Sequence, residues 1–175
     1  LAQTVVQRRM EWQSFKTTPQ YGSLLTAIRR MKANTNAADP NSWSYWTNIH
    51  VNRCPHGIAY FLAWHRGYLY YFERQLRAVS GDSRLVLPYW DYYSYATLPA
   101  EFTNASSTNP LYVPRVNTSV RQALTMAPFS NTLINFPRGW SSAFEPSVES
   151  APHNPVHDII GNANLNVQKA RTLEI

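Results

Sequence analysis

The chain has 175 residues, enough for one domain with a buried core. The content of 44% hydrophobic and 15% charged residues is not that of a disordered chain. No apolar run reaches the length of a membrane helix, about 18 residues, so we expect no membrane partner. The single cysteine excludes an internal disulfide, and the net charge of +6 comes from scattered basic residues, so we expect no nucleic-acid partner. The chain begins with Leu1 and has no signal-like apolar stretch, so we expect a processed protein or a fragment.

The N-terminal part of the chain predicts two helices and a loop. Residues 1–16 show a loose helical periodicity, and residues 21–32 show a better one. Apolar side chains in the second segment recur at steps of three and four, which places them on one helix face. They are Tyr21, Leu24, Ile28 and Met31. Residues 33–46 carry an Asp-Pro-Asn turn signal and predict a loop.

The clearest predicted helix covers residues 65–79 and ends at Gly81, a residue typical of a helix C-terminus. Its apolar face consists of Leu69, Phe72, Leu76 and Val79. Residues 85–87 predict a short strand that Pro88 stops. Few alternating patterns occur elsewhere, so we expect a mainly α protein with long loops.

The C-terminal part of the chain predicts two further helices. Residues 118–127 predict one helix, and residues 130–150 predict a loop. Residues 153–160 predict a short helix with Pro155 in its first turn and Gly161 at its end.

The five histidines fall into two groups. His153 and His157 are four residues apart, so a helix would direct both imidazoles to one side, where they could chelate a metal. His50, His56 and His65 form the other group. Imidazole ligands without a thiolate pair suit copper, iron, nickel or zinc, and all-imidazole ligation suits redox copper in particular. Chance pairs at this spacing are common, so the pattern alone does not settle the metal.

The segments around the histidines resemble tyrosinases, the type 3 dinuclear copper family, from about residue 9 to residue 161. The first copper site is matched by Cys-Pro-His-Gly at 54–57, Phe-Leu-Ala-Trp-His-Arg at 61–66, Phe-Glu-Arg at 72–74 and Leu-Pro-Tyr-Trp-Asp at 87–91. The start of the second site is matched by the segment from Glu149 to His157. The resemblance implies a mainly α fold, in which a four-helix bundle with long loops holds two copper ions, each bound by three histidines.

The resemblance also implies residue roles. The first copper would be bound by His50, His56 and His65, and the second copper by His153 and His157. The family's thioether to the second histidine of the first site would join Cys54 to His56, although a lone cysteine is also often a small buried apolar residue.

A water held near the second copper would be oriented by Glu149 and Asn154, because a carboxylate and an amide oxygen can polarise a water that removes the phenol proton. A solvated loop acid and a helix-start amide are the simpler interpretations of these two residues. Glu73 and Asp91 are candidates for carboxylates behind the histidines, with structural ion pairs as the alternative.

The chain departs from the family after His157, because no further histidine follows. We therefore expect residues 1–161 to be an incomplete copper domain that lacks one bundle helix, and residues 162–175 to be a divergent tail. The sixth ligand would come from a missing segment of a longer enzyme or from a second polypeptide, or the product is truncated and inactive. Alone, the chain is expected to be less active and less stable than a complete relative.

The implied function is that of a phenol oxidase. Copper and dioxygen as co-substrate would hydroxylate small monophenols to o-diphenols and oxidise o-diphenols to o-quinones. The alternatives are an inactive or incomplete copper-binding fragment, an oxidase of catechols only, or an oxygen carrier.

Overall fold

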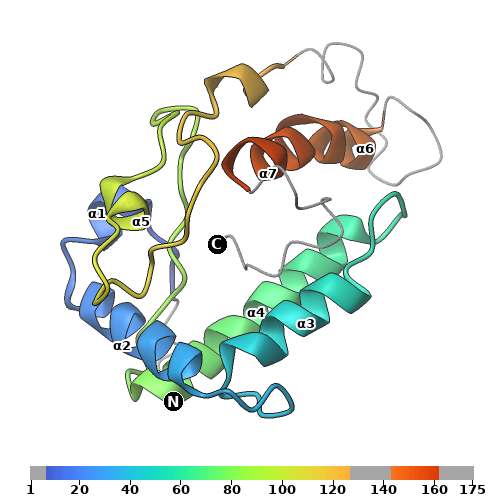
Figure 1. The fold of residues 1–175 in the computed structure, drawn as a ribbon. Coiled ribbons are helices and arrows are strands. Elements are labelled where there is room, and N and C mark those ends of the chain that lie inside the picture. Colours follow the sequence, from blue (N-terminus) through green and yellow to red (C-terminus); the bar gives the residue numbers. More distant parts are fainter. Residues whose placement is uncertain (1–6, 127–142, 162–175) are drawn as a thin grey trace, which may run out of the picture.

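The computed structural model describes residues 7–126 and 143–161, and within these ranges the chain is mainly helical (Figure 1). The described residues contain no β-strand, only two isolated bridges, which confirms the predicted class. None of the described helices has both the length and the apolar character needed to cross a membrane. The elements are α1 (Trp12–Phe15), α2 (Pro19–Ala33), α3 (Trp43–Arg53), α4 (Phe61–Ser80), α5 (Ala100–Thr103), a 3-10 turn (Arg121–Ala123), α6 (Phe144–Val148), a π-helical turn (Glu149–His153) and α7 (Asn154–Ile160).

The two helices with regular apolar periodicity are confirmed. Helix α2 buries the predicted face against α4, and α4 buries Phe72 and Leu76 completely. Helix α4 begins four residues before the predicted start, at Phe61. It ends as predicted at Gly81, whose φ of +79° lies in the left-handed region that favours glycine.

The predicted helix at residues 1–16 is wrong over its described part, where only α1 is helical. Residues 1–6 lie outside the described ranges. The backbone around Met10 is extended, because Trp12 N donates to Tyr89 O at 2.8 Å and Tyr89 N donates to Met10 O at 2.9 Å. Glu11 then caps α1 by accepting from Gln13 N. A contact 78 residues away along the chain thus overrides the weak local periodicity.

Helix α3 lies partly inside the predicted loop of residues 33–46 and was missed. Ser42 starts it, because its hydroxyl accepts a hydrogen bond from Tyr45 N, and tertiary packing buries Trp46 on its inner face. The predicted strand at 85–87 is also wrong: these residues are buried but have no strand partner. In the predicted helix at 118–127, only Arg121–Ala123 is helical among the described residues.

The chain from α6 to α7 is helical on both sides of a break. Residues 144–150 are helical where a loop was predicted, whereas residues 130–142 of that prediction lie outside the described ranges. At Ala151 the backbone is extended (φ −161°, ψ 128°), as expected for a residue that precedes a proline. Beyond the break, α7 confirms the predicted C-terminal helix, with Pro155 in its first turn.

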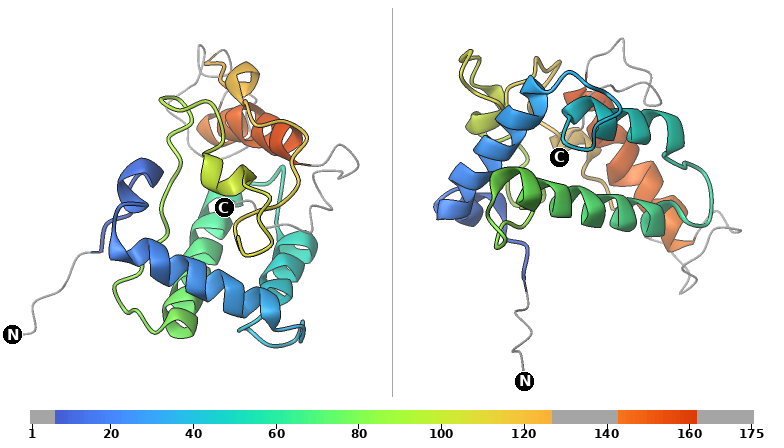
Figure 2. Two further views of the ribbon diagram at one scale, coloured as in Figure 1. Left: turned by 60° about the vertical axis from the view of Figure 1, so that its left-hand side comes forward. Right: turned by 90° about the horizontal axis from the view of Figure 1, so that it is seen from below.

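Helix α2 packs against both α3 and α4, and the α6–α7 segment faces the start of α4 (Figures 1 and 2). Helices α3 and α4 meet through side chains, because Tyr68 Oη donates to Trp46 O at 2.9 Å. Aromatic side chains fill much of the core: the Trp46 and Phe72 rings meet at 5.3 Å, and the Trp12 and Phe102 rings meet at 4.5 Å. A smaller cluster around Val120 and Ile160 lies under α7. Many of the aromatic residues therefore pack in the hydrophobic core.

Candidate metal centre

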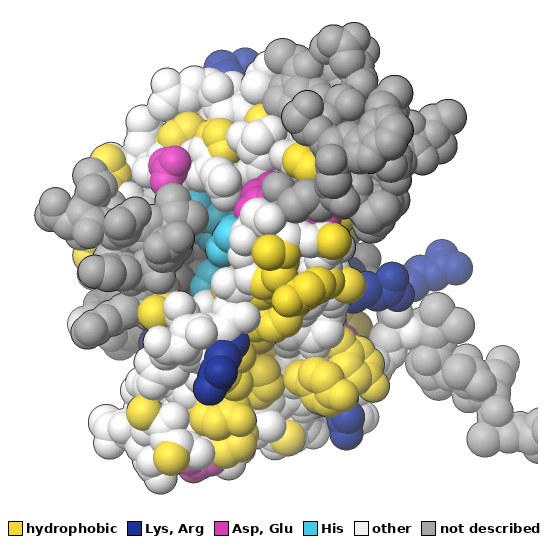
Figure 3. All heavy atoms as spheres, turned by 90° about the vertical axis from the view of Figure 1, so that its right-hand side faces the viewer, with side chains coloured by type: hydrophobic (Ala, Val, Ile, Leu, Met, Phe, Trp, Pro, Cys, Tyr) yellow, Lys and Arg dark blue, Asp and Glu magenta, His cyan; other side chains and the backbone are white. Residues whose placement is uncertain are grey.

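The five histidines come from separate pieces of the chain, and the fold gathers them at one place (Figure 3). The last turn of α3 carries His50, the loop after it carries His56, and the second turn of α4 carries His65. The π-helical turn ends at His153, and α7 carries His157.

The two predicted copper groups lie against each other. The ring of His153 is 5.6 Å from the ring of His56 and 5.6 Å from the ring of His65. One ligand atom from each of these three residues lies within 4.8 Å of the other two. The ring of His50 is 5.9 Å from that of His65, and the ring of His157 is 4.6 Å from that of His153. Such proximity suits a pair of metal ions that share one pocket.

The side chain of Phe61 lies between the two groups and is only 1% exposed. Its ring centroid is 4.4 Å from that of His65 and 4.8 Å from that of His153. The carbonyl oxygen of Phe61 also lies 2.7 Å from His65 Nδ1. A carbonyl can only accept, so Nδ1 carries the proton and Nε2 keeps its lone pair for a metal. Sequence reasoning missed Phe61, although its position four residues before His65 places both on one helix face.

Burial keeps the imidazoles of His50, His56, His65 and His153 uncharged. Burial, and then the charges of the neighbouring histidines, lower the pKa of His50 to about 4 and that of His153 to about 2. Burial also lowers the pKa values of His56 and His65, against an opposing effect of Glu149 on each. A neutral imidazole is the form that binds a metal, so the site is prepared for ligation at neutral pH.

Two buried glutamates four residues apart join the second histidine group to the first. Glu149 Oε1 accepts from Gly57 N at 2.8 Å, and Glu145 Oε1 accepts from Leu62 N at 3.4 Å. The first bond holds the loop of His56, where Gly57 has a φ of +70°. The second places a carboxylate at the N-terminus of α4, where the helix dipole favours a negative charge. Sequence reasoning missed Glu145, whose only local signal is its spacing from Glu149.

Unpartnered polar atoms show where a metal and a water would fit. His153 Nε2 and Asn154 Oδ1 are buried, and neither has a hydrogen-bond partner among residues 7–126 and 143–161. A buried atom of this kind costs free energy unless a ligand or water satisfies it. Because His153 belongs to the three-histidine cluster, a copper ion fits the residues present.

The other candidate residues separate into two kinds. Cys54 lies in the centre, with Sγ 3.2 Å from His65 Nε2. Glu73 serves the structure, because it pairs with Arg9 at 3.2 Å and with Arg77. Asp91 is hydrogen-bonded to Ser94, and neither carboxylate contacts a histidine ring nitrogen in the part of the chain that the structure describes.

A family model and several known proteins match this chain. The model of the common central domain of tyrosinase matches residues 25–140. Tyrosinase HcTyr1 of Hahella sp. is 32% identical over 155 residues, which cover 68% of this chain and 33% of that protein. The chloroplastic polyphenol oxidase A1 of Vicia faba is 26% identical over 181 residues, covering 74% of this chain and 30% of that protein. The chain thus spans about a third of the length of these two relatives.

Solved structures share the fold. A latent aurone synthase (polyphenol oxidase) from a natural source has a TM-score of 0.73 at 20% identity, covering 97% of this chain and 46% of its own. A latent apple tyrosinase has a TM-score of 0.69 at 21% identity, covering 98% of this chain and 50% of its own.

Proposed function

The chain belongs to the tyrosinase family, and we propose that it is a copper-dependent phenol oxidase that hydroxylates small monophenols and oxidises o-diphenols to o-quinones. The observation that carries this proposal is the convergence of five imidazoles, four of them with lowered pKa values, around one buried site. Copper, when bound, supplies the transfer of electrons from the phenol to dioxygen. The protein supplies ligation, a restricted site and control of the substrate proton.

The proposed ligands of the first copper are His50, His56 and His65, and those of the second are His153 and His157. Six imidazoles complete such a pair and this sequence has five, so we propose that the sixth comes from outside these 175 residues, on a further stretch of polypeptide or on another chain. Copper per chain, measured by elemental analysis after reconstitution, tests this. Two coppers support the oxidase with a completed site, whereas one or none assigns the activity to a longer or partnered molecule.

The proposed base is a water held between Glu149 and Asn154. A monophenol must lose its proton before its oxygen can bind a metal, and a carboxylate beside an amide oxygen can orient a water that takes that proton. Support comes from the burial of Glu149 next to the histidines and from the unpartnered Asn154 Oδ1. Glu149 has a second task in this arrangement, because it also holds the amide of Gly57.

The variant Glu149→Gln separates these two tasks. Glutamine retains an oxygen that can accept from Gly57 N but loses the charge that polarises the water. We expect turnover of a monophenol to fall by about 10²-fold while turnover of an o-diphenol changes much less. Glu145→Gln is the matched control, a second buried glutamate that accepts a backbone amide, and it should affect both substrates alike. Equal losses for both substrates in Glu149→Gln would reject the water-holding role.

We also propose that Cys54 Sγ forms a thioether with the ring carbon Cε1 of His56. The sulfur is 3.8 Å from Nδ1 and 3.9 Å from Nε2, so it is equidistant from the two nitrogens that flank Cε1. The bond replaces the thiol S–H and the ring C–H, and it releases two protons and two electrons, which dioxygen accepts. Mass spectrometry of the peptide should show the loss of two hydrogen atoms.

A further inference from the structure

Cys54 has a closer partner than His56. Its Sγ lies 3.2 Å from His65 Nε2, against 3.8 and 3.9 Å from the two ring nitrogens of His56. The lone pair of His65 Nε2 points to this contact, because Nδ1 donates to the carbonyl of Phe61. The thiol therefore donates its proton to His65, and a metal ion could take the place of that proton.

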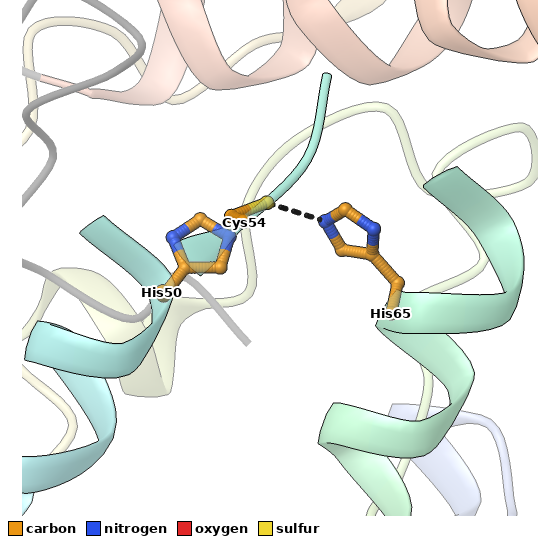
Figure 4. A group of neighbouring side chains, drawn as sticks. All are labelled: His50, Cys54 and His65. Carbon is orange, nitrogen blue, oxygen red and sulfur yellow. Dashed lines mark hydrogen bonds between the residues drawn. The ribbon is translucent and has the colours of Figure 1, made fainter. Parts of the chain in front are cut away.

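The third member of the group is His50. It lies four residues before Cys54 at the end of α3, so one helix face presents both side chains to His65 on α4 (Figure 4). One ligand atom from each of the three residues lies within 4.8 Å of the other two. The three residues thus form a sulfur–nitrogen–nitrogen triangle that shares only His65 with the group of His56, His65 and His153.

We propose that His50, Cys54 and His65 form a thiolate-containing site for one copper(I) ion, which loads before the thioether to His56 forms. The proposal rests on the proposed function only for the identity of the metal. A thiolate is a soft ligand, and a site with one thiolate and two imidazoles favours copper(I) over harder cations.

The geometry of the triangle suits such an ion. Metal–sulfur and metal–nitrogen bonds of about 2.3 and 2.0 Å, joined at a trigonal angle, separate the two ligand atoms by about 3.7 Å. The observed 3.2 Å between Cys54 Sγ and His65 Nε2 needs to open by only a fraction of an ångström. Metal binding and thioether formation use the same sulfur, so they exclude each other. While the thiolate of Cys54 binds the metal, it cannot form the thioether with His56.

Binding also has a proton balance. Cys54 is a free cysteine, so its metal-free sulfur is a thiol that carries one proton. Each copper(I) ion bound to the sulfur therefore releases one proton. No electron is transferred in this step, which distinguishes it from thioether formation.

Alkylation of the thiol tests the site directly, because the chain has a single cysteine. The full chain, prepared without copper and kept anaerobic, is treated with iodoacetamide before and after one equivalent of copper(I), and the adduct is quantified by mass spectrometry. Because the thiolate is the reactive form, the reaction is run at alkaline pH, where we expect measurable alkylation of the metal-free protein and at least about 10-fold slower alkylation with copper(I). The variant His56→Ala should keep this protection, whereas His50→Ala should lose it.

X-ray absorption at the copper edge provides a second measurement that does not depend on thiol reactivity. The parent and His56→Ala should show a sulfur neighbour, and Cys54→Ser should show none. The proposal is overturned if the parent shows no sulfur neighbour, or if His56→Ala loses protection while His50→Ala keeps it. The oxidase proposal fails by other results, namely too little copper after reconstitution in air or no phenol turnover.

Discussion

Replacing Phe61 by alanine tests whether one buried ring holds the two histidine groups together. The ring is 1% exposed and contacts the imidazoles of His65, His153 and His56 at centroid distances of 4.4, 4.8 and 5.5 Å. Truncation leaves a cavity whose walls are rings fixed to three different segments, and these segments cannot collapse together without moving the ligands.

The expected cost is large. Burial at this level places Phe61→Ala in the range of about 3–5 kcal/mol lost from the free energy of unfolding. A domain of this size has a total stability of about 5–15 kcal/mol, so the urea midpoint should fall by about a fifth or more. Tyr60→Ala is the matched control: the neighbouring side chain is 60% exposed, and its removal should cost no more than about 0.5 kcal/mol.

Urea unfolding of the metal-free proteins, followed by circular dichroism, measures both variants. Phe61→Leu should recover about half of the loss, because leucine refills part of the cavity. A cost below about 1 kcal/mol for Phe61→Ala, or equal costs for Phe61→Ala and Tyr60→Ala, would refute the role of Phe61 as the packed link between the two groups.

Two further predictions concern pH and backbone conformation. The unfolded chain takes up protons on His50 and His153 near pH 6.5, whereas the folded chain does so only near pH 4 and pH 2. The free energy of unfolding of the metal-free protein should therefore fall steadily as the pH drops from 6.5 to about 4. In urea titrations at several pH values, His50→Gln should reduce this pH dependence. An unchanged pH dependence in His50→Gln would contradict the lowered pKa of His50. Gly81→Ala should cost about 1–2 kcal/mol because φ is +79° there. Gly22 lies inside α2 with open space around the new Cβ, so Gly22→Ala should raise the free energy of unfolding by about 0.5–1 kcal/mol. Thermal melts measure both glycine variants, and a stability change of the same sign in both would contradict this reasoning.

Several local features of the fold could be predicted from the sequence. Apolar steps of three and four residues located α2 and α4, and Gly81 marked the end of α4 at the correct residue. The i, i+4 spacing of His153 and His157 predicted that the two rings would lie together, as they do at 4.6 Å. These features depend on contacts within one helix, which neighbouring residues encode directly.

Other features could not be predicted, because distant residues determine them. The backbone near Met10 is extended owing to its pairing with Tyr89, and α3 gains its stability from the burial of Trp46 against other helices. The periodicity of the isolated segments is too weak to reveal either. Local propensity is a weak guide where tertiary contacts carry most of the free energy.

The sequence by itself determined the kind of site, because the histidines and the segments around them already indicated a copper domain and predicted five histidines as its ligands. Only the tertiary structure placed His153 against His56 and His65, about 90 residues away along the chain, with Phe61 between the groups. It also showed that Glu149 holds Gly57 and that Cys54 lies closer to His65 than to His56. The physical reason is that ligand type is a property of single residues, whereas distance, burial and pKa arise from segments that meet only when the chain folds.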